Sequence, residues 1–189
     1  MEYQAKLGAP FGVVGIRCTD DVLSGIEFLA PRTRPTPPRD AFARKVCEQL
    51  LAYFADPDFH FTLPLEVGGT AHQGKVWRAM CAIPRGNTRS YGELATQLSS
   101  SPRAVGQACG ANPIPIIIPC HRIVSKAGLG GFMHHDAGHA LDIKCWLLAH
   151  ESVIPAQAGI QVSTSNLRIA ETKPKSILNK SAGFRPAPE

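Results

Sequence analysis

Apolar and polar residues alternate over positions 2–30 with the two-residue period of β-strands. Segments 11–16 (FGVVGI) and 22–29 (VLSGIEFL) carry this pattern most clearly. The polar stretch Thr19-Asp20-Asp21 lies between them and is typical of a hairpin turn. The pattern therefore predicts a strand hairpin at the start of the chain.

A helical spacing replaces the alternation after a Pro- and Arg-rich connector at 31–38, which we expect to be exposed and irregular. Residues 40–53 predict a helix, whose apolar face is expected to contain Phe42, Val46, Leu50, Leu51 and Phe54. Residues 59–65 could form one more short strand. Together these elements predict a small α/β unit, which ends near residue 68.

Start signals for three helices follow. Thr70 is a candidate N-cap for a helix that ends at Pro84. Ser90 and Glu93 have the spacing of a capping box for the second helix, and Pro102 suits the first turn of the third. The second and third helices are joined by only three serines, which is the layout of a helix-turn-helix. Short helix pairs are also common in ordinary cores, so the layout alone leaves DNA binding open.

These patterns predict an α+β protein with an α/β unit at 1–68, a mostly helical unit at 69–151 and a tail at 152–189. The tail is rich in Ser, Thr, Asn, Lys and Pro without a sustained period, so we expect it to be mostly disordered. Its five basic and two acidic residues give it +3 of the net charge of +5. Bulk charge is therefore a weak sign of a polyanionic partner, and local basic residues must carry the case for DNA.

The composition, with 44% hydrophobic and 19% charged residues, is ordinary for a globular protein. There is no run of about 18 apolar residues and no basic-then-apolar start, so we expect no membrane span and a cytoplasmic location. Six cysteines are spread singly and form no CxxC pair. This spacing favours free thiols in a reducing compartment over disulfides or a zinc site.

The strongest candidate for chemistry is Pro119-Cys120-His121-Arg122, which follows the apolar run 114–118 (IPIII). Chemistry at sulfur needs a thiolate, and a free cysteine is mostly protonated at neutral pH. His121 could supply a base and Arg122 a positive charge. A buried, inert cysteine is the common alternative, so the motif needs support from its surroundings.

That support comes from an ordered series of motifs: SYGELA at 90–95, RAVG at 103–106, NPIP at 112–115, IPCHRIV at 118–124 and WLLAHE at 146–151. The series closely resembles the O6-alkylguanine-DNA alkyltransferases, also called methylated-DNA–protein-cysteine methyltransferases. The resemblance is strong from about residue 75 to 151, looser over 1–68 and absent from the tail. It implies a ribonuclease-H-like domain at 1–68, and a winged helix-turn-helix-like domain at 69–151 that binds DNA and holds the active site.

Members of this family repair DNA directly and without a cofactor. The resemblance implies that the partner is double-stranded DNA containing O6-alkylguanine, and that the damaged base is flipped out of the duplex. A cysteine takes the alkyl group from O6 and keeps it as a thioether, so each protein molecule acts once. We expect the protein to be a monomer.

The resemblance also implies roles for five residues of the active site. Cys120 would be the alkyl acceptor, His121 the base that acts through a bridging water, and Glu151 the group that orients the imidazole. Asn112 would hold the thiol in place through its amide. Tyr91, near the flipped nucleotide, would donate a proton to the departing guanine.

The third predicted helix carries the residues that match the family's DNA contacts. Arg103 matches the arginine that fills the space left by the flipped nucleotide. Ala104 and Gly106 are small, as close approach to a minor groove requires.

The substrate pocket is expected to be lined by Pro115, Ile123, Phe132 and Cys109. Phe132 lies in a segment, 131–138, that departs from the family's Gly-Tyr-x-Gly-Gly loop, and its ring can still stack on a base. His134, His135, Asp136 and His139 lack the spacing of a zinc site, so we predict a polar surface loop and no metal.

Three other functions explain parts of the sequence. A non-catalytic alkylated-DNA-binding protein would lack the acceptor cysteine, whereas Cys120 is present. A helix-turn-helix transcription regulator explains the helix pair but not the Pro-Cys-His-Arg motif. A cysteine hydrolase that uses Cys120, His121 and Glu151 does not explain Arg103 and its helix.

Overall fold

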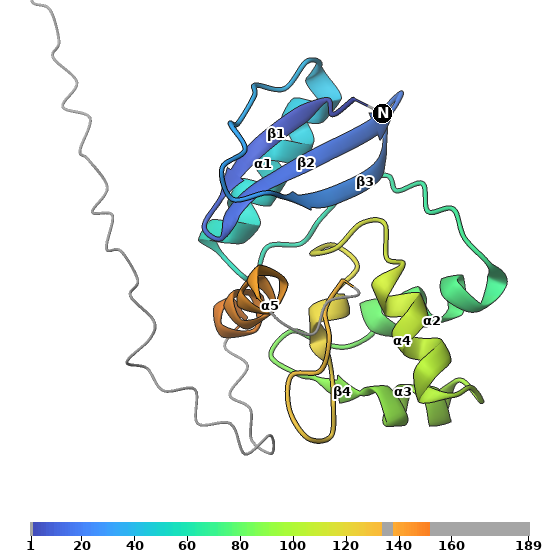
Figure 1. Cartoon of the computed structure of the whole chain (residues 1–189). Coiled ribbons are helices and arrows are strands. Elements are labelled where there is room, and N and C mark those ends of the chain that lie inside the picture. Colours follow the sequence, from blue (N-terminus) through green and yellow to red (C-terminus); the bar gives the residue numbers. More distant parts are fainter. Residues whose placement is uncertain (1, 134–137, 152–189) are drawn as a thin grey trace, which may run out of the picture.

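The computed structural model describes residues 2–133 and 138–151 (Figure 1). The predicted tail and three residues of the His-rich loop, His134, His135 and Asp136, lie outside the described residues. The described part combines small sheets with five α-helices, which confirms the α+β class.

Three antiparallel strands form the first sheet, in the order β1 (Ala5–Ala9), β2 (Gly12–Thr19) and β3 (Val22–Leu29). The predicted hairpin is β2–β3, with Ile16 opposite Ile26. Asp20 has a φ of 53° in its turn, a conformation that Asp tolerates better than most residues.

Helix α1 (Ala41–Ala55) covers one face of this sheet (Figure 1). The Asp40 side chain caps it by accepting from the Ala43 amide at 2.7 Å. Leu50 is buried, whereas Leu51 is 50% exposed. The prediction that Leu51 faces inward was wrong, because adjacent positions on a helix are about 100° apart and Leu50 already occupies the buried stripe.

Residues 59–65 do not form the predicted strand. Only Leu65 makes a backbone bridge, to Leu23 of β3. The alternating residues Phe59, Phe61 and Leu63 instead pack their side chains against the core, without a ladder of hydrogen bonds. The alternation of apolar residues in this segment therefore predicted which side chains are buried, but it could not show whether the backbone pairs with another strand.

The three predicted helices are present as α2 (Ala71–Cys81), α3 (Tyr91–Gln97) and α4 (Pro102–Gly110). Thr70 and Ser90 both act as N-caps with complete capping boxes. Short strands β4 (Arg89–Ser90) and β5 (Ile123–Val124) pair in parallel.

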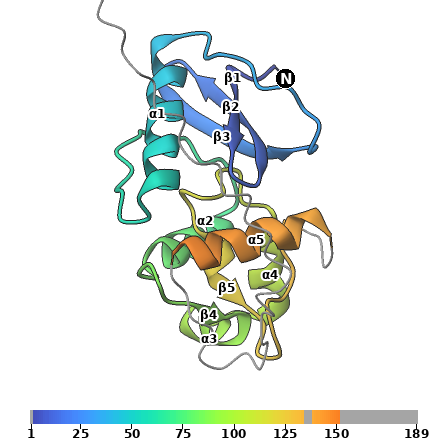
Figure 2. The same ribbon diagram turned by 90° about the vertical axis from the view of Figure 1, so that its left-hand side faces the viewer.

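The 3-10 helix η1 (Cys120–Arg122) comes directly before β5, and α5 (His139–His150) ends the described chain. Figure 2 shows α5 lying between the first sheet and the helices α3 and α4. Trp146 of α5 makes edge contacts with Phe11 and Phe54, at centroid distances of 5.2 and 6.0 Å. One apolar core thus runs from the first sheet through α5 to α2 and α4.

Candidate active site

Cys120 stands at the start of η1, behind a buried turn that Asn112 holds in shape. The Asn112 amide nitrogen donates to the Ile118 carbonyl at 2.8 Å, and its oxygen accepts from the Ile114 amide at 3.1 Å. Both isoleucines are buried. The apolar run therefore fixes the position of the sulfur through packing and through one side-chain amide.

Cys120 is 3% exposed, and burial raises the pKa of its thiol to about 11. A hydrogen bond with the Asn112 side chain and the charge of Lys144 both act in the opposite direction. The resting group is therefore a protonated thiol, and its chemistry needs a base nearby.

His121 is fully buried and binds Glu151, with 3.0 Å between Nε2 and Oε1. Burial lowers the pKa of His121, although the Glu151 carboxylate favours the charged ring. Since an ionised carboxylate only accepts hydrogen bonds, Nε2 carries the hydrogen, which leaves a lone pair on Nδ1. Nδ1 is buried and has no hydrogen-bond partner among the described residues. A neutral imidazole in this tautomer is suited to take up a proton.

Glu151 gathers donors from two parts of the chain, α1 and η1. Arg122 binds it twice, from Nε to Oε2 at 2.9 Å and from Nη2 to Oε1 at 2.8 Å, and the Tyr53 hydroxyl donates to Oε1 at 2.9 Å. Burial opposes ionisation of Glu151, but the hydrogen bonds from His121 and Arg122 and the charge of Arg122 outweigh it and keep the pKa below its ordinary value. The carboxylate is therefore charged and fully paired.

Arg122 does not supply the positive charge that the sequence led us to expect beside the thiol. Its guanidinium points to Glu151 and, through Nη1, to the Ile83 carbonyl at 2.6 Å. The cation that favours a Cys120 thiolate is Lys144 of α5. Arg122 instead stabilises the buried Glu151 carboxylate, because a planar guanidinium can donate to both carboxylate oxygens at once.

Lys144 is a site residue that the sequence reasoning missed. Its side chain is fully buried, and Nζ donates to the carbonyls of Ile123, Leu129 and Gly131 at 2.7, 2.5 and 3.1 Å. Burial lowers its pKa to about 8. The one available signal was a lysine between Ile143 and Cys145, and this position could equally have been exposed.

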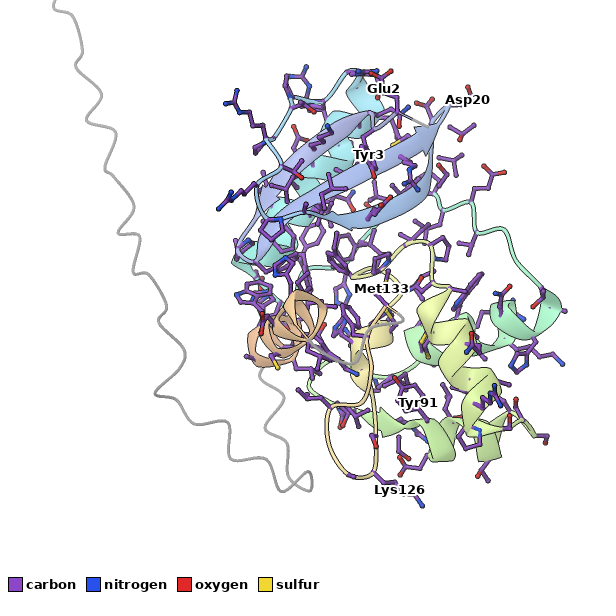
Figure 3. The ribbon with its side chains drawn as sticks, in the orientation of Figure 1. Glu2, Tyr3, Asp20, Tyr91, Lys126 and Met133 are labelled. Carbon is purple, nitrogen blue, oxygen red and sulfur yellow. The ribbon has the colours of Figure 1, made fainter. Side chains whose placement is uncertain are left out.

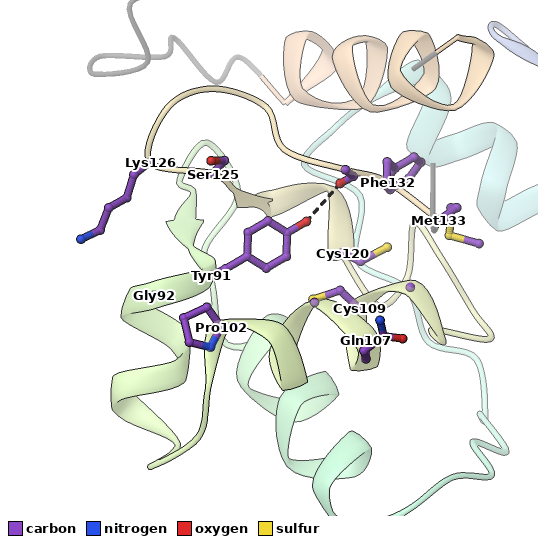
Figure 4. A pocket seen from close by; sticks show the side chains of 13 residues that line it. Tyr91, Gly92, Pro102, Gln107, Cys109, Cys120, Ser125, Lys126, Phe132 and Met133 are labelled. Carbon is purple, nitrogen blue, oxygen red and sulfur yellow. Dashed lines mark hydrogen bonds between the residues drawn. The ribbon is translucent and has the colours of Figure 1, made fainter. Parts of the chain in front are cut away.

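A cavity of about 720 Å³ opens onto the Cys120 sulfur (Figure 4). Tyr91, Cys109, Phe132 and Met133 are among the residues that line it. The Tyr91 hydroxyl donates to the Gly131 carbonyl at 3.0 Å, the same oxygen that accepts from Lys144. Five predicted site residues thus meet at one cavity: Tyr91, Gly106, Cys109, Cys120 and Phe132.

Pro115 and Ile123 do not lie on this cavity, although we expected both in its wall. Each is buried, Pro115 in the turn before Cys120 and Ile123 in β5. Their apolar side chains pack into the protein, whereas the segment Gly131–Phe132–Met133 and the start of α4 border the open space.

Helix α4 forms one wall of the cavity. Pro102, Gly106 and Cys109 line it from successive turns of the helix. A Cβ at Gly106 would stand 3.9 Å from Tyr91 Cε1, an ordinary van der Waals contact, so the Tyr91 ring lies beside this glycine without requiring it. Arg103 is exposed in the first turn of this helix.

Two general findings bear on other kinds of site. Within residues 2–133 and 138–151, no group of three or more His, Cys, Asp and Glu side chains has an arrangement suited to a metal ion. None of the helices in this part of the chain has the length and apolar character needed to cross a bilayer.

The chain is similar to known proteins along most of its length. Residues 71–153 match the family model described as 6-O-methylguanine DNA methyltransferase, DNA binding domain. A methylated-DNA–protein-cysteine methyltransferase of Mycolicibacterium paratuberculosis is 41% identical over 159 residues, which cover 80% of this chain and 92% of that protein. One from Methanosarcina barkeri is 38% identical and covers 79% and 96%.

A solved structure gives the same result. The crystal structure of Mycobacterium tuberculosis OGT in complex with DNA is 38% identical, with a TM-score of 0.67 over 80% of this chain and 93% of that one. Identity at this level over most of both chains shows common descent as well as a common fold. The chain therefore belongs to the family of methylated-DNA–protein-cysteine methyltransferases.

Proposed function

We propose that this protein repairs DNA by moving an alkyl group from O6 of guanine to Cys120, once per molecule. The observation that carries the proposal is the buried series Cys120, His121 and Glu151, of which Cys120 borders a cavity large enough for a base. Family membership supplies the reaction, and the geometry supports the assignment of each part to a residue of this chain.

The proposed step begins with the protonated thiol. The Cys120 proton passes to Nδ1 of the neutral His121, through a bridging water as the family resemblance implies, and Glu151 stabilises the imidazolium that forms. The thiolate attacks the alkyl carbon, the carbon–O6 bond breaks, and its electron pair goes to the guanine. Because the thioether could lose its alkyl group only by expelling a thiolate, which is a poor leaving group here, Cys120 stays alkylated.

The departing guanine gains negative charge, and Tyr91 is the proposed proton donor. Its ring borders the cavity, and its hydroxyl now donates to the Gly131 carbonyl. Donation to the base therefore requires the hydroxyl to turn from that carbonyl. A proton delivered where charge develops lowers the barrier to the transition state.

DNA binding is proposed for the exposed side of α4. Arg103 lies in its first turn, where it could fill the gap left by a flipped nucleotide, and Ala104 and Gly106 leave the helix surface low beside it. The α3–α4 pair supports a helix-turn-helix role for 69–151, of the winged kind that the family resemblance implies. The same resemblance supports a ribonuclease-H-like assignment for 1–68.

A cytoplasmic location follows as part of the proposal. All six cysteines are free thiols in the described chain, and the proposed acceptor must stay reduced to react.

The test uses duplex DNA that carries one O6-methylguanine with a labelled methyl group. We expect label on Cys120, at no more than one per chain, and no transfer by Cys120→Ala. Cys18→Ala is the matched control, because it removes a free thiol of β2 that does not line the cavity, and it should transfer normally. Label on another residue, or more than one methyl group removed per chain, would contradict the proposal.

A further inference from the structure

We infer that Tyr53 of α1 is a positioning residue for the transfer reaction, because its hydroxyl holds Glu151 in place and moderates the bond between Glu151 and His121. The inference rests on the proposed transfer to Cys120 and extends the reacting machinery to the N-terminal part of the chain. The predicted division at residue 68 had placed every reacting group after it.

Two contacts join Tyr53 to the end of α5. Its hydroxyl donates to Glu151 Oε1 at 2.9 Å, and its backbone carbonyl lies 2.7 Å from His150 Nε2. Glu151 and Tyr53 are 98 positions apart, and both are buried. The Tyr53 ring is itself held by contacts with Phe61 and His150, at centroid distances of 5.4 and 5.2 Å. The hydroxyl therefore meets the carboxylate from a rigid position.

The hydroxyl shares an oxygen with the proposed base. Glu151 Oε1 accepts from Tyr53, from Arg122 Nη2 and from His121 Nε2 at distances of 2.8 to 3.0 Å. Each donor withdraws negative charge from that oxygen and so weakens its attraction for the others. Tyr53 therefore reduces the extent to which Glu151 stabilises a protonated His121, and it keeps the resting imidazole neutral.

The other charged and titratable groups around Tyr53 and His121 come from η1, α2, α5 and the loop after α2. Burial, and then the Glu151 carboxylate, raise the pKa of Tyr53, so its hydroxyl keeps its proton. Arg122 of η1 and Lys144 of α5 both disfavour a charged His121. The charge of Arg85, which follows α2, acts to lower the pKa of Tyr53. The charge of Arg122 acts in the same direction on the pKa of Cys81 in α2. A change confined to the Tyr53 hydroxyl leaves all of these groups in place.

The test is Tyr53→Phe, which keeps the ring and removes the hydroxyl. With one donor fewer on Oε1, the pKa of His121 should rise, and a higher pH is then needed for the neutral base. We expect the acid limb of the rate of reaction with free O6-benzylguanine to move up by about half a pH unit. The pKa of His121 should rise by a similar amount in a histidine NMR titration, with the His121 signal assigned from His121→Gln.

Tyr3→Phe is the matched control. The Tyr3 hydroxyl also donates to a carboxylate, Glu27 Oε2 at 2.7 Å, in the same part of the chain. This variant should move neither the acid limb nor the His121 titration.

A Tyr53→Phe protein that reacts more slowly at every pH, with both titrations unmoved, would overturn the inference and leave Tyr53 a packing role. A shift toward lower pH would overturn it as well. If the unmodified protein transfers no alkyl group, the proposed function fails, while the NMR titration still tests the link between Tyr53 and His121.

Discussion

Two clusters in this molecule are built from the same three residue types. On the first sheet, Tyr3 and Arg17 both bind Glu27, and beneath the cavity Tyr53 and Arg122 both bind Glu151. Figure 3 shows Tyr3 on the sheet, well away from Tyr91 at the cavity. The side chains of Arg17 and Glu27 are 35% and 45% exposed, whereas those of Arg122 and Glu151 are 14% and 0% exposed.

The difference in burial changes the strength of the arginine–glutamate interaction and the cost of losing one partner. Near water, an arginine–glutamate pair is screened, and either partner can be solvated when the other is absent. In the interior, an unpaired carboxylate has no such replacement. The buried cluster also includes His121, so its charges act on a group that can exchange a proton near neutral pH.

The largest expected effect is on stability when the arginine is removed. Arg122→Ala leaves Glu151 charged and buried with fewer donors, and should lower the free energy of unfolding by about 3–5 kcal/mol. Arg17→Ala should lower it by about 0–1 kcal/mol. Urea unfolding of both variants measures the difference, and equal losses would show that burial does not separate the clusters.

The parts of the buried cluster differ in how far the sequence could predict them. Cys120 and His121 are adjacent, and Glu151 ends a recognisable motif, so all three were candidates before the fold was known. Tyr53 was read only as a residue of its helix. Its contact with Glu151 depends on how α1 and α5 pack, which no local pattern specifies.

The same dependence on tertiary packing decides which helices and strands the sequence could predict. The starts of α2 and α3 were predictable because a cap at Thr70 or Ser90 is satisfied within three residues. Residues 59–65 were misread as a strand because a strand needs a partner elsewhere in the chain. Pro115 and Ile123 were expected in the pocket and do not line this cavity, because tertiary packing sets the cavity wall.

A second, smaller effect is expected on how the free energy of unfolding changes at acid pH. The pKa of Glu151 is lower in the folded protein than its ordinary value of 4.5, so its contribution to stability is present above pH 4.5 and is lost as the pH falls below it. Glu151→Gln removes this titration. The slope of unfolding free energy against pH, measured from pH 4.5 to 3, should therefore fall by up to about 1.4 kcal/mol per pH unit. An unchanged slope would show that Glu151 does not titrate differently in the two states.

The smallest effect, and the sharpest test of the comparison, is the response to salt. The coupling between arginine and glutamate can be measured for each cluster by a double-mutant cycle in low salt and in 1 M NaCl. For Arg17 and Glu27 we expect about 0.5 kcal/mol in low salt and nearly none in 1 M, where the screening length falls to about 3 Å.

For Arg122 and Glu151 the coupling should persist, because ions cannot enter a site whose carboxylate is fully buried. Loss of both couplings in salt would mean that water and ions reach the buried cluster. Glu151 would then be too well solvated to influence His121 strongly, and the proposed roles of Glu151 and Tyr53 would both weaken. If only the coupling between Arg122 and Glu151 survives in salt, the exclusion of water from this cluster is what allows Glu151 to control the protonation of His121.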